Sequence, residues 1–380
     1  MTEEKTSGKP KITEDRILSA ISAIYKNEEG KTSAETIERI TKSLRYNVSL
    51  KNTTWMRCGG NASVVFSPKN VGDLSIFLQS IDEECRKSVV TLGACSNVII
   101  RDGGIDGIVI KLGAASFGFI DAIDTANSDI KPNETKLFYA GGRALDSFVA
   151  KFCADNGIGG SEFLSGIPGT IGGNIRMNAG CYGACIWEIM THFFAINTSG
   201  EIKLFTTPKC NSLSELQASI AQQAIASKLG LLTQNSNKQY KEESEPTVAE
   251  YRHNPLSNDW IFLGAVFCGT AESPEIINER MRKIKESREN SQPIKERTSG
   301  STFVNPEGES AWKLIDSCGM RGFKIGDGEF SSQHCNFLIN TGDAKSSDLE
   351  KLCTTAQEKI MQKHGISMQM EVKIIGDKID

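Results

Sequence analysis

Two stretches of the 380-residue chain are so rich in glycine that they limit its fold more than any other feature. They are TLGACSNVIIRDGG at 91–104 and GGSEFLSGIPGTIGGNIRMNAGCYG at 159–183. Because glycine has no Cβ and reaches φ > 0, such loops let several backbone N–H groups converge on one anion. The pattern favours a pyrophosphate ligand, although tight turns and close strand packing explain the glycines alone equally well.

The common nucleotide-binding motifs do not fit either stretch. Neither has the lysine of G-x-x-x-x-G-K-[ST], and neither places G-x-G-x-x-G between a strand and a helix. A dinucleotide would therefore bind in another way. The net charge of -4 and the pI near 5.8 give no field that attracts a polyanion, so we expect no nucleic-acid partner.

The cysteines and the apolar runs indicate a cytoplasmic protein with no membrane segment. The 11 cysteines are scattered and odd in number, and Cys181 and Cys185 lack C-x-x-C spacing, so we expect reduced thiols and no metal site. The start MTEEKTSGKPKITEDR is polar and acidic, unlike a secretory signal. No run approaches the ~20 apolar residues that span a bilayer.

Residues 1–46 are expected to form a helical extension. Thr13 would cap a first amphipathic helix and Ser33 a second. Their apolar faces would consist of Ile17, Leu18, Ile21 and Ile24 on the first helix, and of Ile37, Ile40 and Leu44 on the second.

Short β-rich runs and one helix then predict a small α+β unit over 47–112. The expected strands lie at 62–66, 89–92, 97–100 and 107–112, and the helix at 73–87.

A second unit is predicted over 113–272, with a polar insertion at 206–250 that contains a helix near 213–229. Its other elements are strands at 136–140, 192–198, 201–205 and 260–268 and a helix at 143–156, stopped by Gly157.

A third unit, 273–380, begins where Ser273, Pro274 and Glu275 predict a helix start. Helices near 309–318 and 347–364 and a last strand at 371–375 are expected to follow.

Five strings in order resemble the UDP-N-acetylenolpyruvoylglucosamine reductase family, of the shorter type without a tyrosine-bearing loop. They are TLGACSNVIIRDGGIDGIVIKL, AGGRALDSFVAKFCADNGIGGSEFLSGIPGTIGGNIRMNAGCYG, EYRHNPL, GSTFVNP and MEVKIIG, and the resemblance extends from about 52 to 376. It implies an α+β fold: a two-part FAD-binding domain of the PCMH / vanillyl-alcohol-oxidase-like type (47–112 and 113–272) and a C-terminal α+β substrate-binding domain.

The resemblance also implies noncovalent FAD, held by backbone donors without a helix. The candidates for the diphosphate are Gly93, Ala94, Cys95, Ser96, Asn97, Ser165, Gly166, Ile167, Pro168, Gly169, Thr170, Gly172 and Gly173. Further cofactor candidates are Asn52, Thr53, Arg57, Gly59, Asn178, Ala179 and Gly180. Cys95 stands where the family usually has glycine, and Lys373 where it usually has arginine.

By the same resemblance, a monomer would use NADPH to reduce UDP-N-acetylglucosamine enolpyruvate to UDP-N-acetylmuramate for peptidoglycan. Ser301 would donate the proton to C2, and Arg252 would bind the substrate carboxylate. Glu371 would stabilise the intermediate if protonated, or orient water and the substrate. Taken singly, these could be a turn serine, a surface ion-pair arginine and a strand-edge acid. Candidates for the UDP sugar are Tyr251, Arg288, Asn305 and His334, of which His334 could equally be structural. Arg176 is a further substrate candidate that would face either the substrate or the flavin.

Two other functions share part of this pattern. An oxidase of the same flavoprotein superfamily would often tether its flavin covalently, and it lacks GSTFVNP and EYRHNPL. A non-catalytic nucleotide sensor has no need of an acid such as Ser301. Cofactor release on denaturation and NADPH oxidation separate these alternatives.

Overall fold

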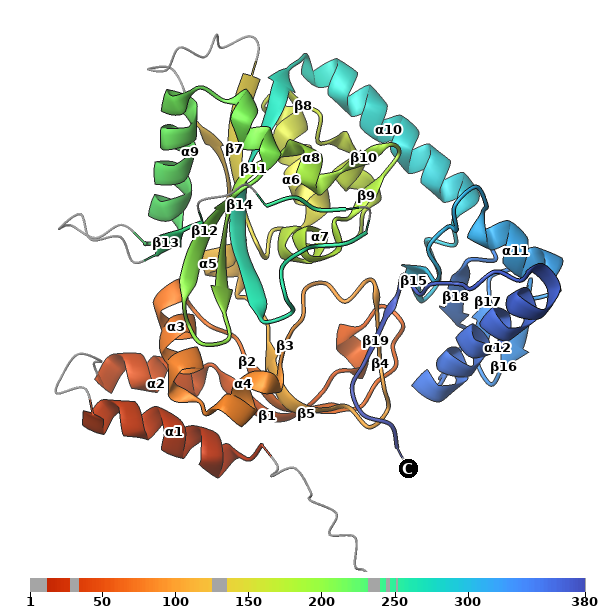
Figure 1. The fold of residues 1–380 in the computed structure, drawn as a ribbon, viewed down its shortest axis with the longest axis horizontal. Coiled ribbons are helices and arrows are strands. Elements are labelled where there is room, and N and C mark those ends of the chain that lie inside the picture. The colour runs from red at the N-terminus through yellow and green to blue at the C-terminus, as the bar shows by residue number, and fades with distance from the viewer. Residues whose placement is uncertain are drawn as a thin grey trace, which may run out of the picture.

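A computed structural model describes residues 12–27, 34–124, 135–231, 240–243, 247–250 and 252–379. It is a mixed α and β structure whose described residues form three larger sheets and two two-stranded sheets, with helices packed around them (Figure 1). No helix in these ranges is long and apolar enough to cross a membrane.

The N-terminal helices pack against the first α+β unit as part of one core. Thr13 Oγ1 accepts the Arg16 N–H at 3.3 Å, which confirms the predicted cap. Ile17, Ile21 and Ile40 are buried against α3. Ser33 and the Ile24 side chain lie outside the described residues. The elements are α1 (Glu14–Asn27) and α2 (Ala34–Lys42).

The prediction that Leu44 belongs to the second helix is wrong. Leu44 begins strand β1 (Leu44–Ser49), because this segment pairs antiparallel with β2. The expected single helix at 73–87 is also wrong: Asp82 caps a second helix by accepting the Cys85 N–H at 2.8 Å. The first sheet has the order β1-β2-β5-β3. The elements after β1 are η1 (Lys51–Thr53), β2 (Asn61–Phe66), α3 (Val71–Ser80), α4 (Glu83–Lys87), β3 (Val89–Thr91), β4 (Val98–Ile100) and β5 (Ile105–Ile110).

The central sheet has a different neighbour on each face. Phe138 and Phe267 point to the face covered by helices α6, α7 and α8. Tyr139 and Val266 point to the other face, which packs on α9 and the first unit. The predicted strands and the helix stopped near Gly157 are confirmed. The sheet has the order β13-β12-β11-β14-β7-β6, with β8 beside β14.

The elements of this region, including the short hairpin β9–β10, follow in chain order. They are α5 (Ala114–Phe117), β6 (Ile120–Ile123), β7 (Thr135–Gly141), α6 (Asp146–Asp155), β8 (Ile158–Gly159), η2 (Glu162–Gly166), α7 (Ile171–Met177), β9 (Gly180–Cys181), β10 (Ala184–Cys185), α8 (Ile186–Ile189), β11 (Met190–Asn197), β12 (Ile202–Thr206), η3 (Pro208–Ser212), α9 (Glu215–Lys228), β13 (Lys241–Glu242) and β14 (Trp260–Ala271).

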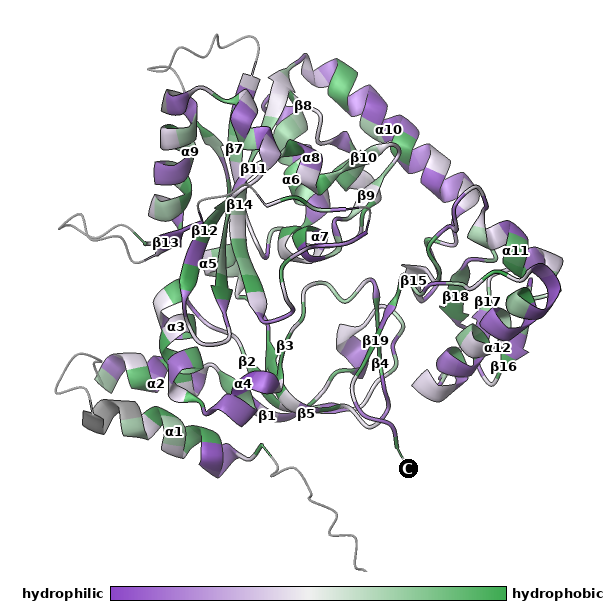
Figure 2. Cartoon of the chain, in the orientation of Figure 1, coloured by the Kyte–Doolittle hydropathy of each residue, from purple (hydrophilic) through white to green (hydrophobic). Residues whose placement is uncertain are grey.

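Helix α10 runs from the central region to the C-terminal sheet, and most of its surface is hydrophilic (Figure 2). Ser273 caps it as predicted. The C-terminal sheet has the order β15-β18-β17-β16. Its elements are α10 (Pro274–Ser291), β15 (Thr298–Ser301), α11 (Ala311–Ser317), β16 (Lys324–Ile325), β17 (Gly328–Phe330), β18 (Phe337–Asn340) and α12 (Ser346–His364), with β19 (Lys373–Ile375) after them.

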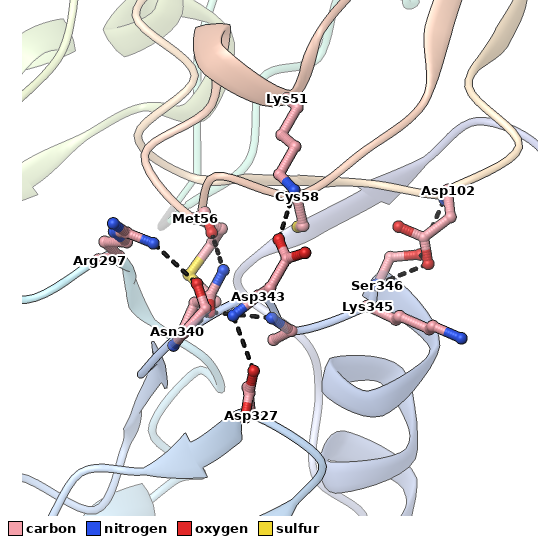
Figure 3. Close-up of polar contacts among 12 residues, drawn as sticks. Lys51, Met56, Cys58, Asp102, Arg297, Asp327, Asn340, Asp343, Lys345 and Ser346 are labelled. Carbon is pink, nitrogen blue, oxygen red and sulfur yellow. Dashed lines mark hydrogen bonds and ion pairs between the residues drawn. The ribbon is translucent and has the colours of Figure 1, made fainter.

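Polar contacts join the C-terminal region to the first unit (Figure 3). Buried Asn340 donates to the Met56 carbonyl at 2.7 Å. Asp102 accepts from the Ser346 N–H at 2.8 Å. Met56, Cys58 and Ile99 also belong to the C-terminal hydrophobic core, so the two regions share one interior.

The last strand closes this junction by pairing in parallel with β4. It begins at Lys373, two residues later than predicted. The reason is that the N–H groups of Glu371 and Val372 both donate to the Thr302 carbonyl instead. Glu371 therefore lies between two segments rather than inside the strand.

Because Ile17 is fully buried, we expect Ile17→Ala to destabilise the whole apoprotein by about 2–5 kcal/mol. The urea midpoint measures this effect. Ser22→Ala, an exposed position on the same helix, should change the free energy of unfolding by less than about 0.5 kcal/mol. An unchanged midpoint for Ile17→Ala would mean that the extension unfolds separately from the core.

Candidate active site

The first glycine loop presents a row of free backbone donors. Within the described parts of the chain, the N–H groups of residues 93–97 donate no hydrogen bond. Cys95 has φ of +55°, the left-handed conformation that also occurs in anion-binding nests. The same φ explains why glycine suits this position. This arrangement fits the diphosphate that the sequence predicts.

The two glycine segments meet at Gly93. A Cβ there would lie 2.5 Å from Thr170 Oγ1, so only glycine allows the second segment to approach this closely. The expectation that the second segment offers donors without a helix is wrong, because residues 171–177 form α7. Its first N–H groups are already bonded, with Ile171 donating to Ala144 and Gly172 to Gly142.

The turn that contains the cofactor candidates at 52–59 lies against the 93–97 loop. Trp55 N–H donates to the Cys95 carbonyl at 3.4 Å. Arg57 donates to the Asn52 carbonyl at 2.6 Å, and Thr53 ends helix η1 beside it. Gly59 packs on Ile100 of β4. The cofactor candidates from 52 to 97 are therefore brought together.

A buried carboxyl group lies beneath the second segment. Asp146 is fully buried, and a Cβ on Gly169 would lie 2.6 Å from its Oδ2. Neither carboxyl oxygen has a well-aligned hydrogen-bond partner in the described chain. Burial raises the pKa of Asp146 well above its ordinary value, although the nearby Asn174 amide and Gly169 N–H act in the opposite direction.

Other candidates of this segment have internal partners. Ser165 donates to the Glu162 carbonyl at 2.7 Å, and Thr170 caps α7 through the Gly173 N–H. Gly166 packs against the side chains of Cys181 and Tyr182. The candidates between them, in the turn that precedes α7, are Ile167 and Pro168.

Arg252 holds the segment that follows α7. Its guanidinium donates to the Gly180 carbonyl at 2.6 Å and to the Asn178 carbonyl at 3.4 Å. Its φ is +54°, a left-handed conformation that costs a non-glycine residue of order 1–3 kcal/mol. Ala179 N–H bonds to Asn174, and Asn178 keeps a buried Oδ1 without a partner in the described residues.

Glu371 approaches Arg252 from the other side. Arg252 Nε lies 3.3 Å from Glu371 Oε1, and both side chains are about one-fifth exposed, at 21% and 18%. Burial raises the pKa of Glu371, and the charges of Arg252 and Lys373 reduce that rise. The pair therefore joins two of the predicted catalytic residues.

Ser301 ends β15 and lies next to the segment that bonds Glu371. Glu371 N–H donates to the carbonyl of the adjacent Thr302 at 2.9 Å. Thr302 Oγ1 is buried and has no hydrogen-bond partner among the described residues. All three predicted catalytic residues thus come from separate motifs and gather in one region.

A cavity of about 860 Å³ lies over hairpin β9–β10, and Asn178, Gly180 and Arg252 line it. This volume is in the range of small-molecule sites. A second cavity, of about 640 Å³, lies between α3 and the turn at Gly200, and its described lining contains none of the predicted site residues.

The substrate candidates are dispersed. Arg176 donates to the carbonyls of Leu256, Ser257 and Trp260, so its guanidinium is already bonded, and burial lowers its pKa to about 10. Asn305 accepts the N–H of Ala311 at the start of α11. Tyr251 lies outside the described residues.

The remaining two lie nearer the candidate centre. Arg288, on α10, is close to Cys181 and Tyr182 of the hairpin. His334 Nδ1 accepts the Asn336 N–H at 3.3 Å, in the turn before β18, the strand that pairs with Ser301.

Sequence reasoning missed two asparagines that support the site. Asn254 joins EYRHNPL to α7 by donating to the Ile175 carbonyl at 2.8 Å. Asn336 makes two bonds to the backbone of Phe303, at 2.8 and 3.0 Å. Asn254 lies inside a recognised string, whereas no sequence signal indicates Asn336. No group of three metal-ligating side chains occurs in the described ranges.

Comparisons with known proteins agree with this geometry. The family model for the C-terminal domain of UDP-N-acetylenolpyruvoylglucosamine reductase matches residues 292–375, and an FAD binding domain matches 62–205. A relative named UDP-N-acetylenolpyruvoylglucosamine reductase from Rickettsia bellii is 39% identical over 87% of this chain and 93% of its own. One of the same name from Maricaulis maris is 39% identical over 86% and 90%.

A solved structure shows the same fold. The crystal structure of UDP-N-acetylenolpyruvylglucosamine reductase from Thermus caldophilus matches with a TM-score of 0.63 and 21% identity. The match covers 88% of this chain and 100% of that chain. The predicted fold class is thereby confirmed.

Asp146→Asn should stabilise the apoprotein increasingly as pH rises above about 4. The unfolded Asp ionises near its ordinary pKa of about 3.9, whereas the folded group, whose pKa is raised by burial, ionises only at higher pH. Between the unfolded and the folded pKa of Asp146, the wild type loses about 1.4 kcal/mol of unfolding free energy per pH unit, and the variant does not.

Urea unfolding between pH 4 and 8 measures the difference, with Asp155→Asn, an exposed carboxyl on the same helix, as the control. A difference between Asp146→Asn and wild type that is independent of pH would contradict the raised pKa.

Proposed function

Since the chain belongs to the UDP-N-acetylenolpyruvoylglucosamine reductase family, we propose that Arg252, Ser301 and Glu371 are its catalytic residues. The enzyme is an FAD-dependent oxidoreductase that uses NADPH to reduce UDP-N-acetylglucosamine enolpyruvate in peptidoglycan synthesis. The observation that carries the assignment is the Arg252–Glu371 contact beside the Ser301 segment.

The cofactor would be held mainly by the loop at 93–97. Its free N–H groups supply donors for the diphosphate without a cationic side chain. The 165–173 segment packs against this loop through Thr170 and limits its position. When bound there, FAD would supply hydride-transfer chemistry between NADPH and the enolpyruvyl group.

Arg252 would stabilise charge on the substrate. As negative charge grows beside the carboxylate, a planar guanidinium offers paired donors that lysine lacks. Arg252 is held by the carbonyls of Asn178 and Gly180, so its place is set before the substrate arrives. Preorganised charge of this kind lowers the barrier because it needs no rearrangement during the reaction.

Ser301 would hold the proton that C2 receives, and Glu371 would assist at the same centre. A protonated Glu371 can donate a hydrogen bond to the developing enolate; burial acts toward that form, and the charges of Arg252 and Lys373 act against it. Arg288 and His334 remain the candidates for the UDP sugar that lie nearest this region.

We also propose that the protein is a cytoplasmic monomer without nucleic-acid or membrane partners. The proposed domain bounds are 1–46, 47–112, 113–272 and 273–380. All 11 cysteines are free, which is consistent with a reducing compartment. Sedimentation of the purified enzyme tests the oligomeric state.

The reaction is tested by the absorbance at 340 nm of FAD-loaded protein with NADPH under anaerobic conditions. We expect loss of NADPH only when UDP-N-acetylglucosamine enolpyruvate is added. Denaturation should release the FAD into the supernatant. A protein that binds FAD but oxidises no NADPH with this substrate would contradict the proposed function.

Ser301→Ala should separate the two half-reactions. Flavin reduction by NADPH should change by less than about twofold, whereas reoxidation by substrate should slow by roughly 10²- to 10⁴-fold, the range for a lost general acid. Anaerobic stopped-flow absorbance measures both. Ser299→Ala, on the same strand, is the matched control. Equal losses in both half-reactions for Ser301→Ala would rule out its role as the acid.

A further inference from the structure

The segment that carries Glu371 is bonded on both sides. On one side, the N–H groups of Glu371 and Val372 donate to the Thr302 carbonyl at 2.9 and 3.4 Å. On the other, Asn97 Nδ2 donates to the Glu371 carbonyl at 3.2 Å, and the Asn97 carbonyl accepts the Lys373 N–H at 3.1 Å.

We propose that Asn97 is a positioning residue that acts through Glu371 and links the cofactor loop to the acid. This proposal rests on the proposed role of Glu371. Asn97 stands at the end of the 93–97 row of free N–H groups, so the residue next to the diphosphate site also fixes the backbone of Glu371.

The chemistry of asparagine suits this position. The β19–β4 pairing begins at Lys373 and Val98, and its regular register does not reach Glu371. The amide side chain of Asn97 extends the bonding two residues further, to the Glu371 carbonyl. Aspartate could not donate this bond, and alanine would leave the carbonyl without its partner.

A displaced Glu371 backbone would alter the contact with Arg252. That contact is 3.3 Å long and joins residues far apart in the chain, so a small shift in either backbone changes it. The loop donors lack partners in the described chain and would gain them from a diphosphate. Cofactor binding should therefore also restrict Glu371.

A double-mutant cycle tests whether Asn97 acts through Glu371. Asn97→Ala should slow the substrate half-reaction at saturating FAD by about three- to tenfold, the effect of one lost hydrogen bond. In the Glu371→Gln background, the same change should cost less than about twofold, because the side chain that it positions has lost its function.

The cycle separates failure of the Asn97 inference from failure of the proposed role of Glu371. If Glu371→Gln slows the half-reaction and the two effects multiply, Asn97 does not act through Glu371 and the inference is wrong. If Glu371→Gln alone changes nothing, the proposed role of Glu371 fails first and the inference fails with it. Asn61→Ala, an exposed asparagine on β2, is the control.

Hydrogen–deuterium exchange of the protein without substrate gives a second measurement that needs no activity. Adding FAD should slow exchange at the amides of 371–375 as well as 93–97. Asn97→Asp, which keeps the side-chain size, should weaken the slowing at 371–375 and serves if Asn97→Ala does not fold. Protection of 93–97 by FAD with no change at 371–375 would overturn the inference.

Discussion

The parallel pairing of β19 with β4 brings the end of the chain back to the first glycine loop. Ile99 and Val372 are buried at this junction, and Arg101 forms a two-bond contact with Glu350 of α12. Because backbone bonds fix the register, the position of Glu371 follows from the position of the cofactor loop. The C-terminal region is thus anchored on the side where the chemistry is expected.

The Arg252–Glu371 contact completes the site from the central region. Taking two charges out of water is costly, and the cost is recovered only with good geometry and further hydrogen bonds. Arg252 has such bonds to two carbonyls, whereas burial raises the pKa of Glu371. A left-handed backbone at Arg252 adds to the cost. Such unfavourable free energies of desolvation and backbone conformation are more typical of a functional site than of a stabilising ion pair.

Most elements could be predicted because local patterns and tertiary contacts agree. The caps at Thr13 and Ser273 and the apolar run at 260–268, which forms a buried strand, are examples. Leu44 could not be assigned, because the apolar spacing of a helix and pairing with β2 both suit it, and the pairing decided. The meeting of Gly93 with Thr170 and of Asn97 with Glu371 depends on contacts between residues distant in sequence, which no local pattern encodes.

The two departures from the family pattern have different physical consequences. Cys95 adopts φ of +55° and packs its side chain in the core with Leu92 and Ile100, so the loop keeps a glycine-like backbone although this residue has a side chain. The thiol lies 3.8 Å from the Gly93 carbonyl. Burial raises the pKa of that thiol, which favours the neutral form. Lys373 instead remains exposed and acts on Glu371 through its charge alone. An arginine there would add paired donors, whereas lysine leaves the orientation of Glu371 to Asn97 and Arg252.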